Sequence, residues 1–191
     1  MSVERAPART MSRPVQLTEA GGPSPGLDQP FEMLSACHER VERTLDVLER
    51  LRRHVATHGP DTQAAQAARD VLRYFDLAAP QHHLDEERHV LPALRASGDA
   101  QLQALAERLH DDHRRMEAAW AAARTILSAI VEGRLDRLQH DDRTVLAGFA
   151  NLYSGHIAAE EGTAFPEAAR RLDDTAVRTM GADMRTRRGA T

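Results

Sequence analysis

The chain has little of what several common architectures require. Only one of its 191 residues is cysteine, Cys37, which excludes an intramolecular disulfide and a cysteine-based zinc or iron–sulfur site. Aromatic residues make up 4% of the chain, and lysine is absent, so every basic side chain is arginine. A core poor in aromatics must be built from leucine, valine and alanine, which favours helices. No strand pattern competes with this interpretation.

Charge and hydropathy exclude two further classes of partner. The net charge is −4 with histidine neutral, which gives no polyanion-binding surface and predicts no nucleic-acid partner. No apolar run reaches the roughly 18 residues of a membrane-spanning helix. The N-terminus lacks the apolar region of a secretory signal. We therefore expect a cytoplasmic protein without a membrane contact, as a monomer or a homodimer.

The proline and glycine pattern separates a tail from a helical region. Residues 1–29 are rich in both residue types and are expected to be disordered. Asp61 is a candidate N-cap, and Pro92 and Pro166 are expected to bend the helices that contain them. Four long helical patterns follow the tail, over about 31–57, 62–96, 100–132 and 135–172.

These helices and their short connections predict an all-α fold. The connections are short enough to place successive helices side by side in opposite directions. We expect an up-down-up-down four-helix bundle over 30–172, with a short extra C-terminal helix and tail over 173–191.

A repeated unit is the most informative pattern in the chain. It has the form Phe-x6-His-x3-Glu-x5-Pro and occurs twice, as Phe75-x6-His82-x3-Glu86-x5-Pro92 and Phe149-x6-His156-x3-Glu160-x5-Pro166. One further histidine precedes each copy at nearly the same distance, His38 before the first and His113 before the second. The pattern indicates one helical hairpin written twice.

The repeated histidines and glutamates fall on the apolar faces of their helices. At about 100° per residue, Glu86 lies about 40° from His82, within the apolar stripe of its helix, and Glu160 stands in the same relation to His156. Buried carboxylates are costly unless they are paired or bound to metal. Imidazole and carboxylate together suit iron, manganese or zinc. Two bridging carboxylates call for two ions about 3.5–4 Å apart. The candidate metal ligands are His38, His82, Glu86, His113, His156 and Glu160.

Neighbouring histidines offer rival positions. His83 and Glu87 also form a His-x3-Glu pair, but they lie about 100° and 140° from His82 on the helix. We expect both on the flank or the surface. His110 lies farther than His113 from the apolar stripe of its helix, and it is a candidate fifth histidine or a residue that orients a ligand.

Three more features have open interpretations. Glu42 and Glu117 are expected at the surface or in contact with a ligand imidazole. His89 is either a pocket residue or a solvent-facing one. One leucine stripe recurs every seven residues on the side of its helix opposite the ligands and is expected to pack on the C-terminal helix or on a second subunit: Leu77, Leu84 and Leu91.

With these residues identified, the chain resembles the hemerythrin-like, HHE cation-binding family over about 31–171. The resemblance rests on His-x3-Glu-Glu followed by proline in both copies and on single histidines in the other two helices. It implies a four-helix bundle around a non-haem centre of two iron ions with an oxo or hydroxo bridge, with zinc or manganese as alternatives. The implied ligands are His38, His82, Glu86, His113, His156 and Glu160.

The chain departs from the oxygen-carrying members of that family. Their pattern has His-x3-His on the third helix and His-x4-Asp on the fourth, whereas this chain has Leu109 four residues before His113 and has His156-x3-Glu160. The six-ligand set is more similar to bacterial members linked to iron, oxygen or nitric-oxide stress. The cluster-repair branch resembles it too, but often carries a cysteine-bearing N-terminal domain that this sequence lacks.

Three functions are consistent with the sequence. The first is a di-iron protein that binds or senses oxygen or nitric oxide, or handles iron. The second is a di-iron oxidase, a peroxidase, or an enzyme of nitric-oxide stress and iron-centre repair, with His89 or His110 as proton donor. The third is a metal-free or zinc-bound structural bundle. No catalytic residue stands out, so the sequence leaves open whether the protein is an enzyme.

Overall fold

The structure is a computed structural model that describes residue 26 and residues 28–189. All regular secondary structure in that part of the chain is helical. The predicted disordered tail over 1–29 falls almost wholly outside the described residues and stays a prediction. No helix in the described part is long and apolar enough to cross a membrane.

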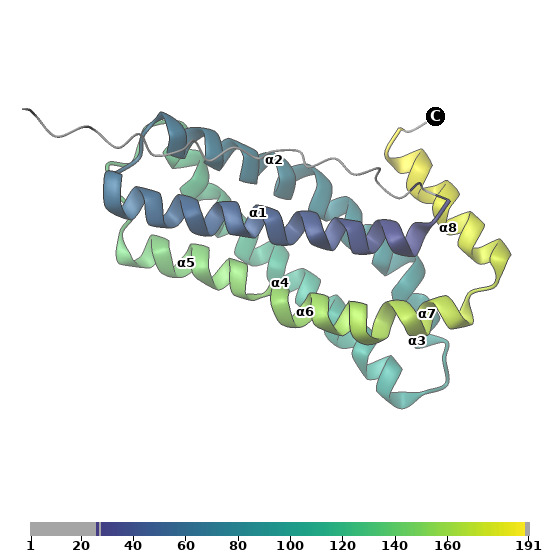
Figure 1. The fold of residues 1–191 in the computed structure, drawn as a ribbon. Helices are drawn as coiled ribbons and strands as arrows, with labels where there is room; N and C mark the ends of the chain where they lie inside the picture. The colour runs from purple at the N-terminus through teal and green to yellow at the C-terminus, as the bar shows by residue number, and fades with distance from the viewer. Residues whose placement is uncertain (1–25, 27, 190–191) are drawn as a thin grey trace, which may run out of the picture.

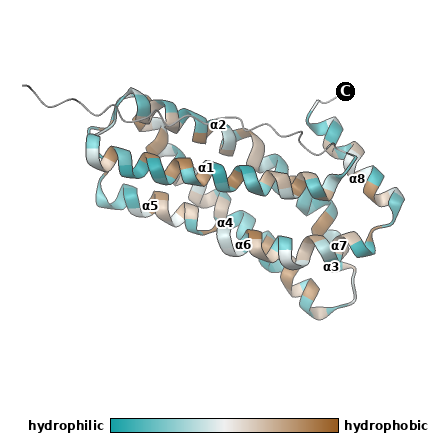
Figure 2. Ribbon diagram, viewed as in Figure 1, coloured by the Kyte–Doolittle hydropathy of each residue, from teal (hydrophilic) through white to brown (hydrophobic). Residues whose placement is uncertain are grey.

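Long helical segments lie side by side and form an elongated bundle (Figure 1). Helix α1 contacts α2 and α5, and α4 contacts the same two neighbours, so the contacts close a ring around one core. The outward face of α1 is largely hydrophilic (Figure 2). The helices are α1 (Pro30–His58), α2 (Thr62–Asp85), α3 (Leu91–Arg95), α4 (Ala100–Val131), α5 (His140–Asn151), α6 (Tyr153–Ala159), α7 (Phe165–Arg171) and α8 (Asp174–Arg187), with π-helices η1 (Glu86–Val90) and η2 (Glu160–Ala164).

Aspartate side chains begin three of the helices. Asp61 accepts a hydrogen bond of 2.8 Å from the backbone N–H of Ala64, which confirms it as the N-cap of α2. Asp99 caps α4 and Asp173 caps α8 in the same way. The fourth long helix starts at His140 and not at about 135. The connection before it still contributes to the core, because Leu138 is buried and Leu135 is partly buried.

Each copy of the repeated unit contains a wide helical turn. π-Helix η1 begins at Glu86 and η2 at Glu160, and each ends two residues before the repeated proline. The backbone N–H of Leu91 reaches the carbonyl of Glu86, and that of Phe165 reaches the carbonyl of Glu160. A proline lacks an N–H and its ring clashes with the carbonyl four residues earlier, so a wider turn accommodates it. The disturbance expected at the two prolines therefore takes the form of π-turns on their N-terminal side.

Two hydrophobic clusters fill the core, and a polar layer separates them. The first cluster includes the aromatic residues Phe75, Phe149 and Tyr153. The second lies nearer α8 and includes Leu34, Leu91, Leu109, Phe165, Met180 and Met184. The candidate ligands fall between the two clusters on every helix, so apolar side chains close both ends of the polar layer.

The leucine stripe of the first repeat does not form one surface. Leu77 is 66% exposed, whereas Leu91 is fully buried in the cluster that contains Met180 and Met184 of α8. The π-turn between the two leucines holds an extra residue, which rotates the later part of the helix by roughly 100°. Packing against the C-terminal helix is thus confirmed for Leu91 and wrong for Leu77, for which the alternative of a second subunit stays a prediction.

Helix α8 is fixed to the bundle by a buried carboxylate. Asp85 has no exposed side-chain surface, and it forms ion pairs with both Arg187 and Arg188 from the last turn of α8. Asp183 of α8 pairs with Arg88 at 3.2 Å and with the Nε2 of His89 at 2.9 Å. A buried carboxylate without a cationic partner is strongly destabilising, so Asp85 holds α8 in place.

Replacing Arg187 and Arg188 together with alanine should leave Asp85 buried and uncompensated. We expect the free energy of unfolding to fall by about 3–5 kcal/mol, measured by urea denaturation. The control is Arg185→Ala on the same helix, which breaks only the exposed pair with Asp28 and should cost less than about 1 kcal/mol. Equal effects of the two changes would contradict the role given to Asp85.

Candidate metal centre

The six candidate ligands predicted from the sequence meet in the polar layer. They come from α1 (His38), α2 (His82), η1 (Glu86), α4 (His113), α6 (His156) and η2 (Glu160). All are buried, with exposed fractions between 0% and 4%. Six polar side chains from four parts of the bundle therefore share one interior space that solvent does not reach.

Glu86 faces histidines on both sides of this space. Its Oε1 lies 3.1 Å from the Nε2 of His82 and 3.8 Å from the Nε2 of His38. Its Oε2 lies 3.4 Å from the Nε2 of His113. The two oxygens of one carboxylate are thus directed toward different histidines, which is the arrangement of a bridging ligand.

Glu160 takes the matching position from the second copy of the repeat. Its Oε2 lies 3.1 Å from the Nε2 of His156 and 3.0 Å from the Nε2 of His38. Its Oε1 lies 3.8 Å from the Nε2 of His113. Glu86 and Glu160 consequently belong to two groups of ligand atoms, one completed by His38 and His82 and the other by His113 and His156.

Most of the inward-facing atoms have no hydrogen bond. Both carboxylate oxygens of Glu86 and of Glu160 are buried without a hydrogen-bond partner, as are the Nε2 atoms of His38, His113 and His156. Buried polar atoms without a partner are costly and rare. Nitrogen and oxygen donors left free around one point are what a metal ion requires, so these residues fit a metal site.

Carboxylates outside the ligand set accept hydrogen bonds from the outward nitrogens of two histidines. The Nδ1 of His38 donates to Glu161 at 2.6 Å, and the Nδ1 of His113 donates to Glu87 at 3.0 Å. The Nδ1 of His156 is not held in this way: it lies 3.8 Å from Asp112 and has no hydrogen-bond partner among the described residues. A carboxylate on Nδ1 fixes the ring and leaves the lone pair on Nε2, the tautomer that binds metal.

His83 and Glu87 lie on the flank of their helix and are partly exposed, as expected, but both contact the candidate ligand His113. Glu87 is partly exposed, but its carboxylate orients His113. His83 stacks on His113 with ring centroids 4.2 Å apart, and it forms a third group of ligand atoms with His113 and His156. A helical wheel gives the direction of each side chain relative to the centre of the apolar face. It does not show that the flank of α2 packs against α4.

Other candidates lie away from the centre. The Nε2 of His89 pairs with Asp183 of α8. His110 is 38% exposed, with its Nδ1 3.3 Å from Glu87. Glu42 and Glu117 are exposed, in line with the surface alternative. The repeat itself could have identified the orienting carboxylates, because a second glutamate follows the first in both copies.

The buried histidines and glutamates strongly shift the pKa values of one another. Burial alone would lower the pKa of His38, but its contact with Glu160 raises that pKa to about 9. Burial acts likewise on His113, yet Glu160 and Glu86 raise its pKa to about 10. Burial and repulsion by His38 lower the pKa of His82 to about 3. Burial and the charge of Glu160 raise the pKa of Glu86. Protons and metal ions therefore compete for the same atoms.

Comparison with known proteins agrees with this site. The chain matches the family model described as hemerythrin HHE cation binding domain over residues 29–168, and it belongs to that family. An uncharacterized protein of Haemophilus influenzae is 31% identical over 134 residues, which cover 70% of this chain and 76% of that protein. The match ends before α8 begins, so the helix held by Asp85 lies outside the shared domain.

Alanine at Glu86 should remove a carboxylate that serves both groups of ligands. We expect Glu86→Ala to keep at most half of the metal bound by the wild type, as measured by elemental analysis. Glu87→Ala should keep the full amount but weaken affinity by about 10- to 100-fold in a chelator competition, because it only orients His113. Glu39→Ala, on an exposed side chain, is the control. Equal metal loss in both site variants would contradict these roles.

Metal should stabilise the fold, because it relieves the burial of free donor atoms. At a free metal concentration about 100 times the dissociation constant, the gain is about 2.7 kcal/mol. For a chain of this size that corresponds to a rise in melting temperature of roughly 5–10 °C. Calorimetry with and without chelator measures it. Identical melting temperatures would mean that the six side chains do not bind metal.

Proposed function

We propose that the chain is an up-down-up-down four-helix bundle that holds two iron ions and binds a small ligand, oxygen or nitric oxide, at them. The observation that carries this proposal is the pair of ligand groups that share Glu86 and Glu160. One shared carboxylate could serve a single ion, but two shared carboxylates between two pairs of histidines suit two adjacent ions.

The donor set supports iron among the alternatives. Each group offers two imidazole nitrogens and two carboxylate oxygens. This mixture suits iron, manganese or zinc, and an iron site with few protein ligands keeps open positions. Iron in such a site supplies redox-active binding of small molecules, whereas the side chains hold and orient it.

The geometry favours a protein that binds a small ligand over an enzyme that uses His89 or His110 as its proton donor. His89 and His110 were the candidate proton donors of an enzyme, but Asp183 holds the first, and the second is partly exposed beside Glu87. A purely structural bundle is disfavoured for a different reason. Its interior would keep the buried atoms of Glu86 and Glu160 without partners, at a cost in stability.

Iron loading tests the proposal directly. The full chain is reconstituted with ferrous iron without oxygen, its iron content is measured, and it is then exposed to air or to nitric oxide. We expect about two iron ions per chain, which is the number that two bridging carboxylates serve. We also expect new absorption bands after air and after nitric oxide. Zinc-loaded protein, which has no redox chemistry, is the matched control. Iron content below one per chain, or a spectrum unchanged by both gases, would overturn the proposal.

A further inference from the structure

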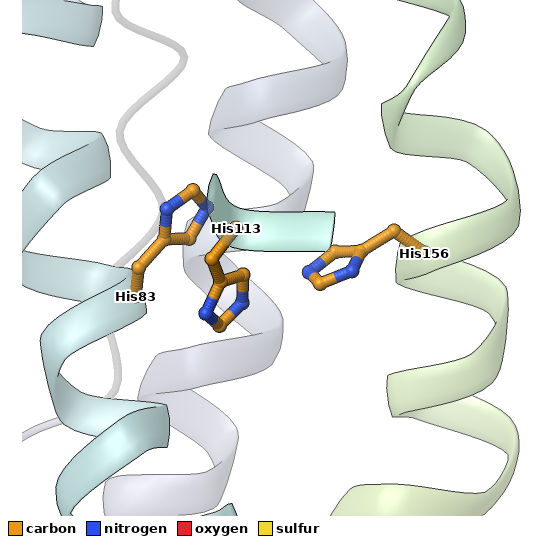
Figure 3. A group of neighbouring side chains, drawn as sticks. All are labelled: His83, His113 and His156. Carbon is orange, nitrogen blue, oxygen red and sulfur yellow. The ribbon is translucent and has the colours of Figure 1, made fainter. Parts of the chain in front are cut away.

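His83 breaks the symmetry of the duplicated site. The residue that follows the ligand histidine is His83 in the first copy and Ile157 in the second. Ile157 packs in the hydrophobic core. The ring of His83 lies beside that of His113, with centroids 4.2 Å apart, and is about as far from His82, at 6.0 Å, as from His156, at 6.2 Å. Figure 3 shows the imidazoles of His83, His113 and His156. The two copies therefore differ in polarity at the position next to the candidate ligand histidine.

The orientation of His83 separates it from the metal ligands. An imidazole binds a metal along a direction that lies in its ring plane. The rings of His83 and His113 are stacked, with planes 8° apart and centroids separated by 4.2 Å. Stacked rings keep their planes about 3.5 Å apart, the contact distance of their atoms. The two rings therefore cannot both direct a nitrogen lone pair at a single ion that His113 would hold.

The position of His83 still brings it close to that ion. Ligand atoms of His83, His113 and His156 lie within 4.8 Å of one another. The Nε2 atoms of His113 and His156 face Glu160, on the inner side. A ring nitrogen of His83 is therefore near enough to contact an atom bound at the ion.

The ring nitrogens of His83 are also available for a hydrogen bond. Among the described residues, no hydrogen bond or ion pair occupies it, in contrast to His38 and His113, whose outward nitrogens are held by carboxylates. His83 is partly buried, whereas His113 and His156 are buried. Its ring nitrogens are therefore free to meet a small molecule next to His113 and His156.

We propose that His83 donates a hydrogen bond to the small ligand, beside the ion that His113 and His156 would hold, and that it is not itself a metal ligand. This inference rests on the proposed function and deepens it. It assigns the hydrogen bond to one of the two proposed ions, because the other copy has the apolar Ile157 at the equivalent sequence position.

The test compares variants of the full iron-loaded chain with nitric oxide as the probe. His83→Phe keeps a planar ring that can stack on His113 but removes the donor, and His83→Gln keeps a donor in a smaller side chain. His140→Phe makes the same chemical change at an exposed histidine that begins α5. Iron content is measured by elemental analysis, and nitric-oxide release is followed optically after a scavenger is added.

We expect wild-type iron content in all three variants and release about three- to tenfold faster in His83→Phe, the loss of one neutral hydrogen bond. His83→Gln should lie nearer the wild type, and His140→Phe should match it. Lower iron content in both His83 variants would show that His83 ligates the metal and would overturn the inference. Unchanged release in His83→Phe would overturn it as well. A wild-type chain that takes up iron but responds neither to air nor to nitric oxide would overturn the proposed function, and that result is seen before any variant is compared. A wild-type chain that responds to air but binds no nitric oxide would overturn this inference alone.

Discussion

Two carboxylates without exposed surface impose the main constraint on this molecule. Glu86 and Glu160 lie at the centre of the bundle, 0% and 1% exposed, and their oxygens have no hydrogen-bond partner. The residue before Glu86 is also a buried acid, but the charge of this residue, Asp85, is neutralised by Arg187 and Arg188. One buried acid is matched by guanidinium groups and its neighbour by imidazoles, which leaves only the second with atoms free for a cation.

The duplication makes each half of the chain orient a candidate ligand of the other half. Glu87, in the first copy, holds the ring of His113 from the second, and Glu161, in the second copy, holds the ring of His38 from the first. Neither hairpin can therefore build its own ion site with fixed imidazoles. Because an orienting carboxylate raises the basicity of its imidazole, the ligands on α1 and α4 depend on the docking of the two hairpins for their strength as well as their position.

Much of the site could be predicted from the sequence because the repeat reports it twice. A histidine and a glutamate four residues apart on one apolar face mean little alone, but recurrence with matched phenylalanine and proline makes chance agreement improbable. The helices could be predicted as well, because their apolar residues recur with helical periodicity. Two features could not be predicted. A helical wheel assumes a uniform rotation of 100° per residue and therefore cannot show the π-turns. The direction of a side chain on its own helix also does not reveal which neighbouring helix it meets, as when His83 of α2 stacks on His113 of α4.

The paired π-turns also limit how this chain can change in length. Each turn carries one residue more than a regular helix would need between the bridging glutamate and its proline. A deletion of one residue there would restore regular winding and swing the following segment by roughly a quarter of a revolution. Leu91 and Leu94, now fully enclosed, would then face a different neighbour. Positions in these turns whose side chains make no contact with the centre can therefore be substituted, but a change in the number of residues would disrupt the packing that follows.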